Sequence, residues 1–430
     1  MMTRRIAVAG ASMGGLRAAE QLRSAGWEED IVVLGQEARP PYNRPPLSKE
    51  LLAAPGSAAE ALAAVTLRQR RTATGIDWRL GAPVTRADLS ARTLTLATGE
   101  ELAYDGLVIA TGLRPARVEV PGPRHGRHVI RTIDDTLGLH RELRPDTRVV
   151  VVGAGFIGCE AAATATSLGC RVTLVEGGSG PMERPLGRRL SDGVRGFLEG
   201  NGVRCLSGHR VVEFLSETGD ETGNWSGDGY DGGSHLRCAG VRLSDGTEVP
   251  ADVVIEAVGS KPNTEWLAGN GLDLADGVLC DESMRVIGAG GALPSVVAVG
   301  DVARYPDQRA GTGARRVEHW ATPADTAKIA APALVAGLNG AEVPEPAAPL
   351  PSFWTDIFKI RIQGVGSPAL AERIEVLEGD PDRPAAGAAL GYYRSGRLIG
   401  AVTCALPADK QLHYRKLVTD AGVAARLAAA

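Results

Sequence analysis

Two stretches of this sequence follow one pattern: Ile6-Ala-Val-Ala-Gly-Ala-Ser-Met-Gly-Gly15 and Val149-Val-Val-Val-Gly-Ala-Gly-Phe-Ile-Gly158. Each has an apolar strand, then a glycine turn, then the start of an Ala-rich helix. In this order the first backbone N–H groups of the helix point at a pyrophosphate. The pattern predicts an α/β fold with two Rossmann-like nucleotide-binding domains. Two such loops in one chain suggest two cofactors held face to face, as in a flavin enzyme that a nicotinamide reduces.

Size and composition are those of a globular enzyme. The chain has 430 residues, of which 44% are hydrophobic and 23% charged, and its length favours roughly three domains. The net charge of −4 gives no overall basic field that would attract nucleic acid. No apolar stretch reaches the roughly 18 residues of a membrane span, and no leader-like segment precedes the first strand. We therefore expect a cytoplasmic protein with no nucleic-acid or membrane partner.

The cysteines are scattered along the chain. They are Cys159, Cys170, Cys205, Cys238, Cys280 and Cys404. None are spaced as Cys-x-x-Cys, so we expect neither a structural zinc nor a dithiol redox centre. Many flavoproteins with two nucleotide sites pass electrons from flavin to an internal disulfide, and this chain offers no obvious one.

Several other segments bear on how the chain is organised. A proline-rich loop at 39–49 is expected to line a surface or a site, because its prolines exclude a regular helix. Residues 216–235 are rich in Gly, Asp and Glu and read as a flexible tip between two strands. A hairpin is expected around 93–102 and a helix at 324–338. After the proline-rich linker at 343–351, a small α+β module completes the chain.

The second glycine pattern is the more complete of the two. Gly153 would make the tight turn, Gly155 would let the backbone approach the pyrophosphate, and Gly158 would let helix and strand pack closely. Glu176 ends the next strand, where its carboxylate can accept hydrogen bonds from the adenosine ribose and repel a 2′-phosphate. The following stretch, 177–180, supplies no arginine for such a phosphate. This arrangement favours NADH over NADPH.

The first pattern departs from the usual one at two points. Ser12 stands where the second glycine is expected, and its Cβ narrows the gap to the phosphates. At the end of the next strand, Gln36 occupies the expected acidic position and Glu37 follows it, so either side chain could reach a ribose. The other glycines are present, at Gly10, Gly14 and Gly15.

A series of motifs then appears in a fixed order. They are Pro41-Tyr-Asn-Arg-Pro-Pro-Leu-Ser-Lys49, Ala110-Thr-Gly112, Gly153-Ala-Gly-Phe-Ile-Gly-Cys-Glu160, Ala257-Val-Gly-Ser-Lys-Pro-Asn263, Val299-Gly-Asp-Val-Ala303 and Val317-Glu-His-Trp320. Over nearly its whole length the chain resembles the FAD-dependent, NADH-using ferredoxin reductases that serve cytochromes P450 and Rieske-type dioxygenases, including the putidaredoxin reductases. Rubredoxin reductases and the apoptosis-inducing-factor oxidoreductases are wider relatives. The resemblance implies a glutathione-reductase-like pair of domains and a small C-terminal α+β domain.

The resemblance also implies a role for individual residues. Gly10, Gly14 and Gly15 would line the FAD pyrophosphate, Asp301 would bind the ribityl chain, and Arg44, Lys49, Val84 and Arg131 would lie along the FAD. Lys49 would be near the reactive edge of the flavin, Trp320 beside the flavin and the nicotinamide, and Glu160 facing the nicotinamide and pairing with Lys49. Lysine is rare here, with six lysines against 41 arginines, so a lysine at this position is informative. A cation there would stabilise an anionic reduced ring.

Each role has an ordinary structural alternative. Lys49 could be a solvated surface charge, Trp320 a core residue and Asp301 a helix cap, and Arg131 is one of many arginines. His319 is expected to be structural. The chain departs from its relatives at Ile357-Phe-Lys359, where they usually have Gln-Tyr-Asp, and at 321–326 after the Trp motif. These departures concern the electron acceptor more than the cofactors.

These observations together predict a three-domain flavoprotein. The FAD domain would comprise residues 1–114 and 258–323, the NADH domain 115–257 and the C-terminal domain 324–430, which would cover the flavin and help to form the partner surface. NADH would transfer a hydride to flavin N5, and the flavin would then pass single electrons to a small iron–sulfur ferredoxin. Two alternatives stay open: an NADH oxidase or rubredoxin reductase, and a redox-sensing protein that binds NADH, like the apoptosis-inducing-factor relatives.

Overall fold

The first glycine turn follows β1 (Arg5–Ala9), a central strand of a six-stranded sheet. The computed structural model describes residues 4–218, 236–307, 311–346 and 348–427. The sheet has the order β19–β20–β7–β1–β2–β3, with β19 at Arg285–Gly288, β20 at Gly291–Ala298, β7 at Gly106–Ile109, β2 at Asp30–Gly35 and β3 at Ile76–Leu80. β1 pairs in parallel with β2 and with β7. The sheet thus joins the start of the chain to a segment near residue 290.

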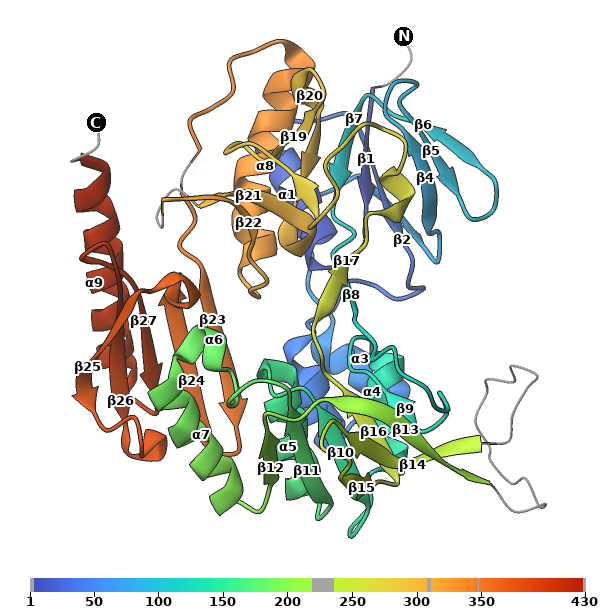
Figure 1. Cartoon of the computed structure of the whole chain (residues 1–430). Coiled ribbons are helices and arrows are strands. Elements are labelled where there is room, and N and C mark those ends of the chain that lie inside the picture. The colour runs from blue at the N-terminus through green and yellow to red at the C-terminus, as the bar shows by residue number, and fades with distance from the viewer. Residues whose placement is uncertain (1–3, 219–235, 308–310, 347, 428–430) are drawn as a thin grey trace.

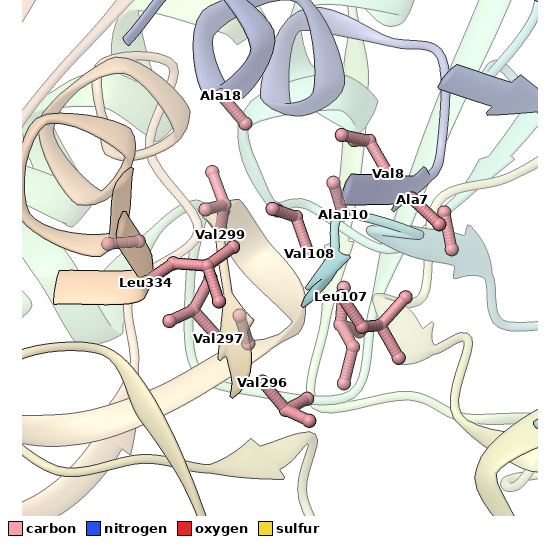
Figure 2. Close-up of a cluster of buried hydrophobic side chains, with 14 of the residues drawn as sticks. Ala7, Val8, Ala18, Leu107, Val108, Ala110, Val296, Val297, Val299 and Leu334 are labelled. Carbon is pink, nitrogen blue, oxygen red and sulfur yellow. The ribbon is translucent and has the colours of Figure 1, made fainter. Parts of the chain in front are cut away.

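The core of this sheet is a layer of aliphatic side chains (Figure 2). Val8, Val108 and Val297 from three neighbouring strands are buried and pack in one cluster with Leu334 of α8 (Thr322–Asn339). α8 lies beside α1 (Met13–Ser24), the helix that follows the glycine turn. Parallel strands buried in this way are apolar at nearly every position, as these are. The packing fixes the strand ends from which the loops around Gly10 and Asp301 emerge.

The second glycine turn has the same setting in a second parallel sheet. Its order is β12–β11–β10–β16–β9, with β12 at Arg204–Ser207, β11 at Arg171–Glu176, β10 at Arg148–Val152, β16 at Val253–Glu256 and β9 at Arg127–His128. Its helices are α4 (Ile133–Glu142), α5 (Phe156–Ser167) and α7 (Arg188–Gly200). A small antiparallel sheet of β13 (Val211–Thr218), β14 (Leu236–Leu243) and β15 (Glu248–Pro250) accompanies it. Of the glycine-rich insertion at 216–235, residues 219–235 lie outside the described residues.

Two short antiparallel strands connect the two sheets. β8 (Leu113–Pro115) leads out of the first sheet, and β17 (Ser260–Pro262) leads back after the second. Figure 1 shows this pair between the upper and lower parts of the molecule. The chain therefore leaves the first unit, builds the second unit, and returns to complete the first.

The C-terminal part forms a separate antiparallel sheet. Its order is β23–β24–β27–β26–β25, with β23 at Ser352–Ile357, β24 at Ile360–Gly366, β27 at Arg397–Cys404, β26 at Ala388–Arg394 and β25 at Arg373–Gly379, and α9 (Ala408–Leu427) follows. The sheet lies beside α5, α6 (Glu183–Leu186) and α7 of the second unit. The Tyr392 hydroxyl donates a buried 2.6 Å hydrogen bond to the Leu186 carbonyl oxygen. The C-terminal sheet is thus attached mainly to the second unit.

Shorter elements complete the fold. They are η1 (Pro45–Ser48), α2 (Glu50–Ala53), α3 (Ala58–Val65), β4 (Val84–Asp88), β5 (Thr93–Leu96), β6 (Glu101–Ala103), η2 (Glu265–Leu267), β18 (Val278–Leu279), η3 (Gly300–Val302), β21 (Ala303–Asp307), β22 (Thr312–Arg316), η4 (Pro368–Leu370) and η5 (Pro384–Ala386). The expected hairpin is confirmed as β5–β6. The proline-rich loop contains the short turn η1, and Gly155 occupies the N-cap position of α5.

These sheets confirm the predicted fold class: α/β, with two Rossmann-like units and a small C-terminal α+β domain. Over the residues that the structure describes, no helix has both the length and the apolar character needed to cross a membrane.

Candidate functional site

The two glycine turns have nearly the same local geometry. The first glycine of each has a positive φ, +120° at Gly10 and +100° at Gly153. A Cβ at Gly10 would lie 2.2 Å from the carbonyl oxygen of Ala110, and a Cβ at Gly153 would lie 2.4 Å from that of Ala257. Any residue other than glycine would be strained at both positions and would clash with backbone. Each turn is therefore held against the end of the neighbouring parallel strand.

The other residues of the two patterns divide into two groups. A Cβ at Gly15 or Gly158 would lie 1.9 Å from the carbonyl oxygen of Gly10 or Gly153 respectively, so these glycines let helix and strand touch and lie outside the cavities described below. Ser12 and Gly155, the residues before α1 and α5, both line cavities. A Cβ on Gly155 would meet nothing within 4 Å. Gly14, in the first turn of α1, also lines a cavity.

A cavity of about 660 Å³ extends from the first glycine turn. Its lining includes Gly10, Ser12, Gln36, Glu37, Arg44, Val84 and Arg131. The Glu37 carboxylate accepts hydrogen bonds from the Tyr42 hydroxyl and, at 2.7 Å, from the Arg44 guanidinium. Gln36 is exposed and also lines the cavity. Both side chains that could bind a ribose therefore reach the cavity, and the hydrogen bonds from Tyr42 and Arg44 fix only Glu37 in position.

A second cavity, of about 250 Å³, continues from the first and is lined by both units and by the C-terminal sheet. Ser12, Tyr42, Arg44 and Arg131 line both cavities. The second one brings together the three residues that the sequence assigns to chemistry: Lys49, Glu160 and Trp320. The chemical roles of these three residues stay predictions. The three residues come from separate segments of the chain and line the same cavity.

A buried hydrogen-bonded cluster centres on the Glu160 carboxylate. The Lys49 ammonium lies 2.8 Å from Glu160 Oε1, and the two side chains are only 12% and 6% exposed. The Ser48 hydroxyl donates a 2.6 Å hydrogen bond to Oε2, and the Thr355 hydroxyl donates one of the same length to Oε1. Lys49 is thus not a solvated surface charge. The cluster joins the proline-rich loop, helix α5 and strand β23.

Asp301 and Arg131 place opposite charges at these cavities. Asp301 Oδ1 is buried and has no hydrogen-bond partner among the described residues. Burial raises the pKa of Asp301 to about 6, although Arg131 opposes the shift. Burial, followed by the nearby charge of Arg44, lowers the pKa of Arg131 to about 10. A polar group bound between these two side chains would satisfy both.

Aromatic side chains surround the outer end of the second cavity. Trp320 is 44% exposed, so it is not a core residue, and its indole N–H donates a 2.6 Å hydrogen bond to Asn43. Its ring packs edge-on against Trp354, with the centroids 5.2 Å apart. His319 lies against Phe353, with 5.4 Å between ring centroids, and burial lowers the pKa of His319 to about 4. The imidazole, expected only to be structural, is therefore neutral and lines the cavity.

A third cavity, of about 730 Å³, begins at the second glycine turn. Gly153, Gly155 and Glu176 line it, together with His209 and Arg210. The Glu176 carboxylate accepts hydrogen bonds from the backbone N–H groups of Ala154, at 2.6 Å, and Gly178, at 2.7 Å. The carboxylate therefore lies at the end of the cavity where the pattern places the adenosine ribose.

The second and third cavities share a wall. Ile130, Arg131, Phe156, Ile157, Asp301 and Glu318 line both of them. A group bound along the first and second cavities and a group bound along the third would therefore meet near Phe156. This shared wall is what two face-to-face cofactors require.

The motifs did not single out several residues that line these cavities. Thr355, Phe353 and Trp354 come from the C-terminal sheet, and no local pattern marks them. Tyr42 and Ser48 lie inside the proline-rich motif and were not given a role. Their position in the sequence, beside Arg44 and Lys49, is the feature that could have indicated that they line the cavity.

Comparisons with known proteins agree with this geometry. The sequence model of one family, pyridine nucleotide-disulphide oxidoreductase, matches residues 4–327. The biphenyl dioxygenase system ferredoxin–NAD(+) reductase component of Paraburkholderia xenovorans is 35% identical over 84% of this chain and 80% of its own length. Rhodocoxin reductase of Rhodococcus erythropolis is 32% identical over 96% of this chain and 90% of its own. A chain in the crystal structure of the covalent putidaredoxin reductase–putidaredoxin complex has a TM-score of 0.82 and 28% identity, covering 97% of this chain and 93% of that one.

Proposed function

The chain belongs to the pyridine nucleotide-disulphide oxidoreductase family and, within it, to the ferredoxin–NAD(+) reductases, and from this premise we propose that it carries electrons from NADH through FAD to a small ferredoxin. The relatives confirm the sequence-based predictions of the family, of an oxidoreductase that uses a flavin and NAD(H), and of an iron–sulfur partner that feeds an oxygenase. The shared wall between the cavities of the two glycine turns carries the proposal.

FAD is the flavin that the first two cavities suit best. The first is lined by a carboxylate, Glu37, held where a ribose would be bound, and it leads past the N-terminus of α1 into the second. Two continuous cavities of this extent suit a dinucleotide rather than a mononucleotide. Asp301 Oδ1, which has no hydrogen-bond partner among the described residues, and the Arg131 guanidinium fit a polar chain between the two ends. When bound there, FAD accepts a hydride from NADH and releases single electrons.

The residues of this chain would position the cofactors and exclude competing reactions. The Lys49 ammonium supplies a positive charge at the second cavity, where Glu160 holds it. The Glu160 carboxylate is in turn held by hydrogen bonds from the Ser48 and Thr355 hydroxyls. Neutral His319 adds no second charge to that cavity near pH 7. Hydride transfer between two such cofactors would require no general acid or base, so these residues would bind and orient the rings rather than move a proton.

The outer end of the second cavity is where we expect the ferredoxin to approach. All six cysteines, each within the described residues, are free thiols. Trp320 is exposed next to Trp354, so the C-terminal sheet contributes to this surface.

We propose that the chain divides into three domains: 1–114 with 258–323, 115–257, and 324–430. The strand pair β8–β17, where the chain passes between the first two domains, supports this division. A cytoplasmic location stays a prediction.

Turnover distinguishes the proposed reductase from its alternatives. The purified holoprotein is mixed with NADH, a ferredoxin from the same source and cytochrome c. We expect fast cytochrome c reduction that depends on the ferredoxin. Rapid peroxide formation without any carrier would instead support an NADH oxidase. A long-lived reduced flavin–NAD⁺ complex with little turnover would support a redox-sensing protein.

A further inference from the structure

The end of the third cavity beside Glu176 contains a cation, Arg210, that no sequence motif marks. Arg210 lies against the diglycine that follows Glu176: a Cβ on Gly177 would be 3.3 Å from Arg210 Cγ and 3.7 Å from its Nε. On the other side, a Cβ on Gly178 would be 3.2 Å from Glu176 Oε1. The carboxylate and the guanidinium stem therefore flank the same two residues, and both side chains line the cavity.

The backbone around Arg210 is held firmly in this place. The His209 N–H donates to the Glu176 carbonyl oxygen at 3.1 Å, and the Gly208 N–H donates to that of Gly178 at 2.8 Å. Arg210 and Ser244 form two hydrogen bonds: the Arg210 N–H donates to the Ser244 hydroxyl at 3.2 Å, and the Ser244 N–H donates to the Arg210 carbonyl oxygen at 2.8 Å. The segment after β12 thus runs alongside the end of β11 and keeps Arg210 at the cavity.

The Arg210 guanidinium and the Glu176 carboxylate form no ion pair with each other. Over residues 4–218, 236–307, 311–346 and 348–427, no carboxylate lies within 4.0 Å of the exposed Arg210 guanidinium. Glu176 is engaged with two backbone N–H groups, and the neighbouring His209 lies 3.6 Å from Asp245. A guanidinium with no carboxylate partner in that part of the chain, next to the position expected for the ribose, has the chemistry to bind a phosphate in bidentate fashion.

We propose that Arg210 is a dormant partner for a 2′-phosphate and that Glu176 alone keeps this site selective for NADH. A 2′-phosphate carries up to two negative charges, which the Glu176 carboxylate repels. Removal of that carboxylate leaves the Ala154 and Gly178 N–H groups free to donate, opposite the Arg210 guanidinium. The inference rests on the proposed function only in requiring that the nicotinamide cofactor binds in this cavity.

Binding of adenosine fragments to the holoprotein tests the inference without turnover. Calorimetry compares adenosine 2′,5′-bisphosphate with adenosine 5′-phosphate in the wild type, Glu176→Ala, and Glu176→Ala with Arg210→Ala. We expect Glu176→Ala to raise the preference for the bisphosphate by about 10- to 100-fold, and the added Arg210→Ala to remove at least about 10-fold of that gain. Arg204→Ala in the same background is the control, since Arg204 is an exposed arginine of β12 outside the cavity.

The inference is overturned if the double variant keeps the full preference of Glu176→Ala, or if Arg204→Ala lowers it as much as Arg210→Ala does. Glu176→Gln replaces Glu176→Ala should the alanine variant not fold. The ratio of flavin reduction rates with NADPH and NADH is the second readout and should follow the fragment preference. If NADH reduces the flavin but Arg210→Ala leaves the ratio of the rates with NADPH and NADH unchanged, this inference alone fails. If NADH reduces the flavin in no variant while the fragment preference still depends on Arg210, the proposed function fails and the inference stands.

Discussion

Removal of the Lys49 ammonium perturbs the cluster that joins three parts of the chain. In Lys49→Met, the Glu160 carboxylate stays buried with two hydroxyl donors, Ser48 and Thr355, and without its countercharge. Breaking one partner of a buried pair typically costs about 3–5 kcal/mol. Because two hydrogen bonds remain, we expect a loss of about 3 kcal/mol in the free energy of unfolding.

The double variant shows whether this loss comes from the stranded charge. Glu160→Gln combined with Lys49→Met removes both charges, and the Gln carbonyl oxygen still accepts one hydroxyl hydrogen bond. We expect the double variant to recover at least about 2 kcal/mol relative to the sum of the single losses. Urea unfolding followed by tryptophan fluorescence measures each free energy.

A surface pair on α8 provides the matched control. Lys328 and Asp325 lie 3.1 Å apart with side chains 58% and 30% exposed. The same cycle with Lys328→Met and Asp325→Asn should show a coupling of about 0.2–1 kcal/mol. The reasoning is refuted if the Lys49 and Glu160 losses simply add, or if their coupling is no larger than that of the surface pair.

Three further changes test separate parts of the account. Thr355→Val removes the 2.6 Å hydrogen bond to Glu160 and should lower the free energy of unfolding in urea by about 1–2 kcal/mol. Thr403→Val, which changes another buried threonine of the same sheet, should lower it less, and equal losses would contradict this. The folded-state pKa of His319 is depressed to about 4, so its contribution to stability is present above its unfolded value of 6.5 and is lost as the pH falls toward 4. The free energy of unfolding of His319→Gln, measured in urea, should therefore decline less than that of the wild type over this window, by up to about 3 kcal/mol, and parallel declines would argue against a buried neutral imidazole. Glu176→Arg should raise kcat/KM for NADPH relative to NADH, and an unchanged ratio in steady-state assays would count against the assignment of Glu176.

The sequence predicted those features that depend on neighbouring residues. The turns at Gly10 and Gly153 require glycine because a Cβ would clash with the next strand, and this requirement appears directly in the sequence. Lys49, Glu160 and Trp320 lie in motifs, and the fold brings them to one cavity.

Features that depend on tertiary packing could not be predicted in this way. The hydroxyl of Thr355 reaches Glu160 across 195 positions of sequence, and no periodicity in β23 marks it. Arg210 follows a different strand from Glu176, so a search of the residues after Glu176 finds no arginine although the fold supplies one. His319 gives no sequence signal of its depressed pKa, which comes from burial against the C-terminal sheet.

Anaerobic titration of the purified yellow holoprotein with NADH is the most direct measurement of whether the two cofactors meet at the shared wall. We predict that about one equivalent of NADH bleaches the flavin absorption at about 450 nm, and that oxidised ferredoxin then restores it. NADH that binds but leaves the flavin oxidised would contradict the account.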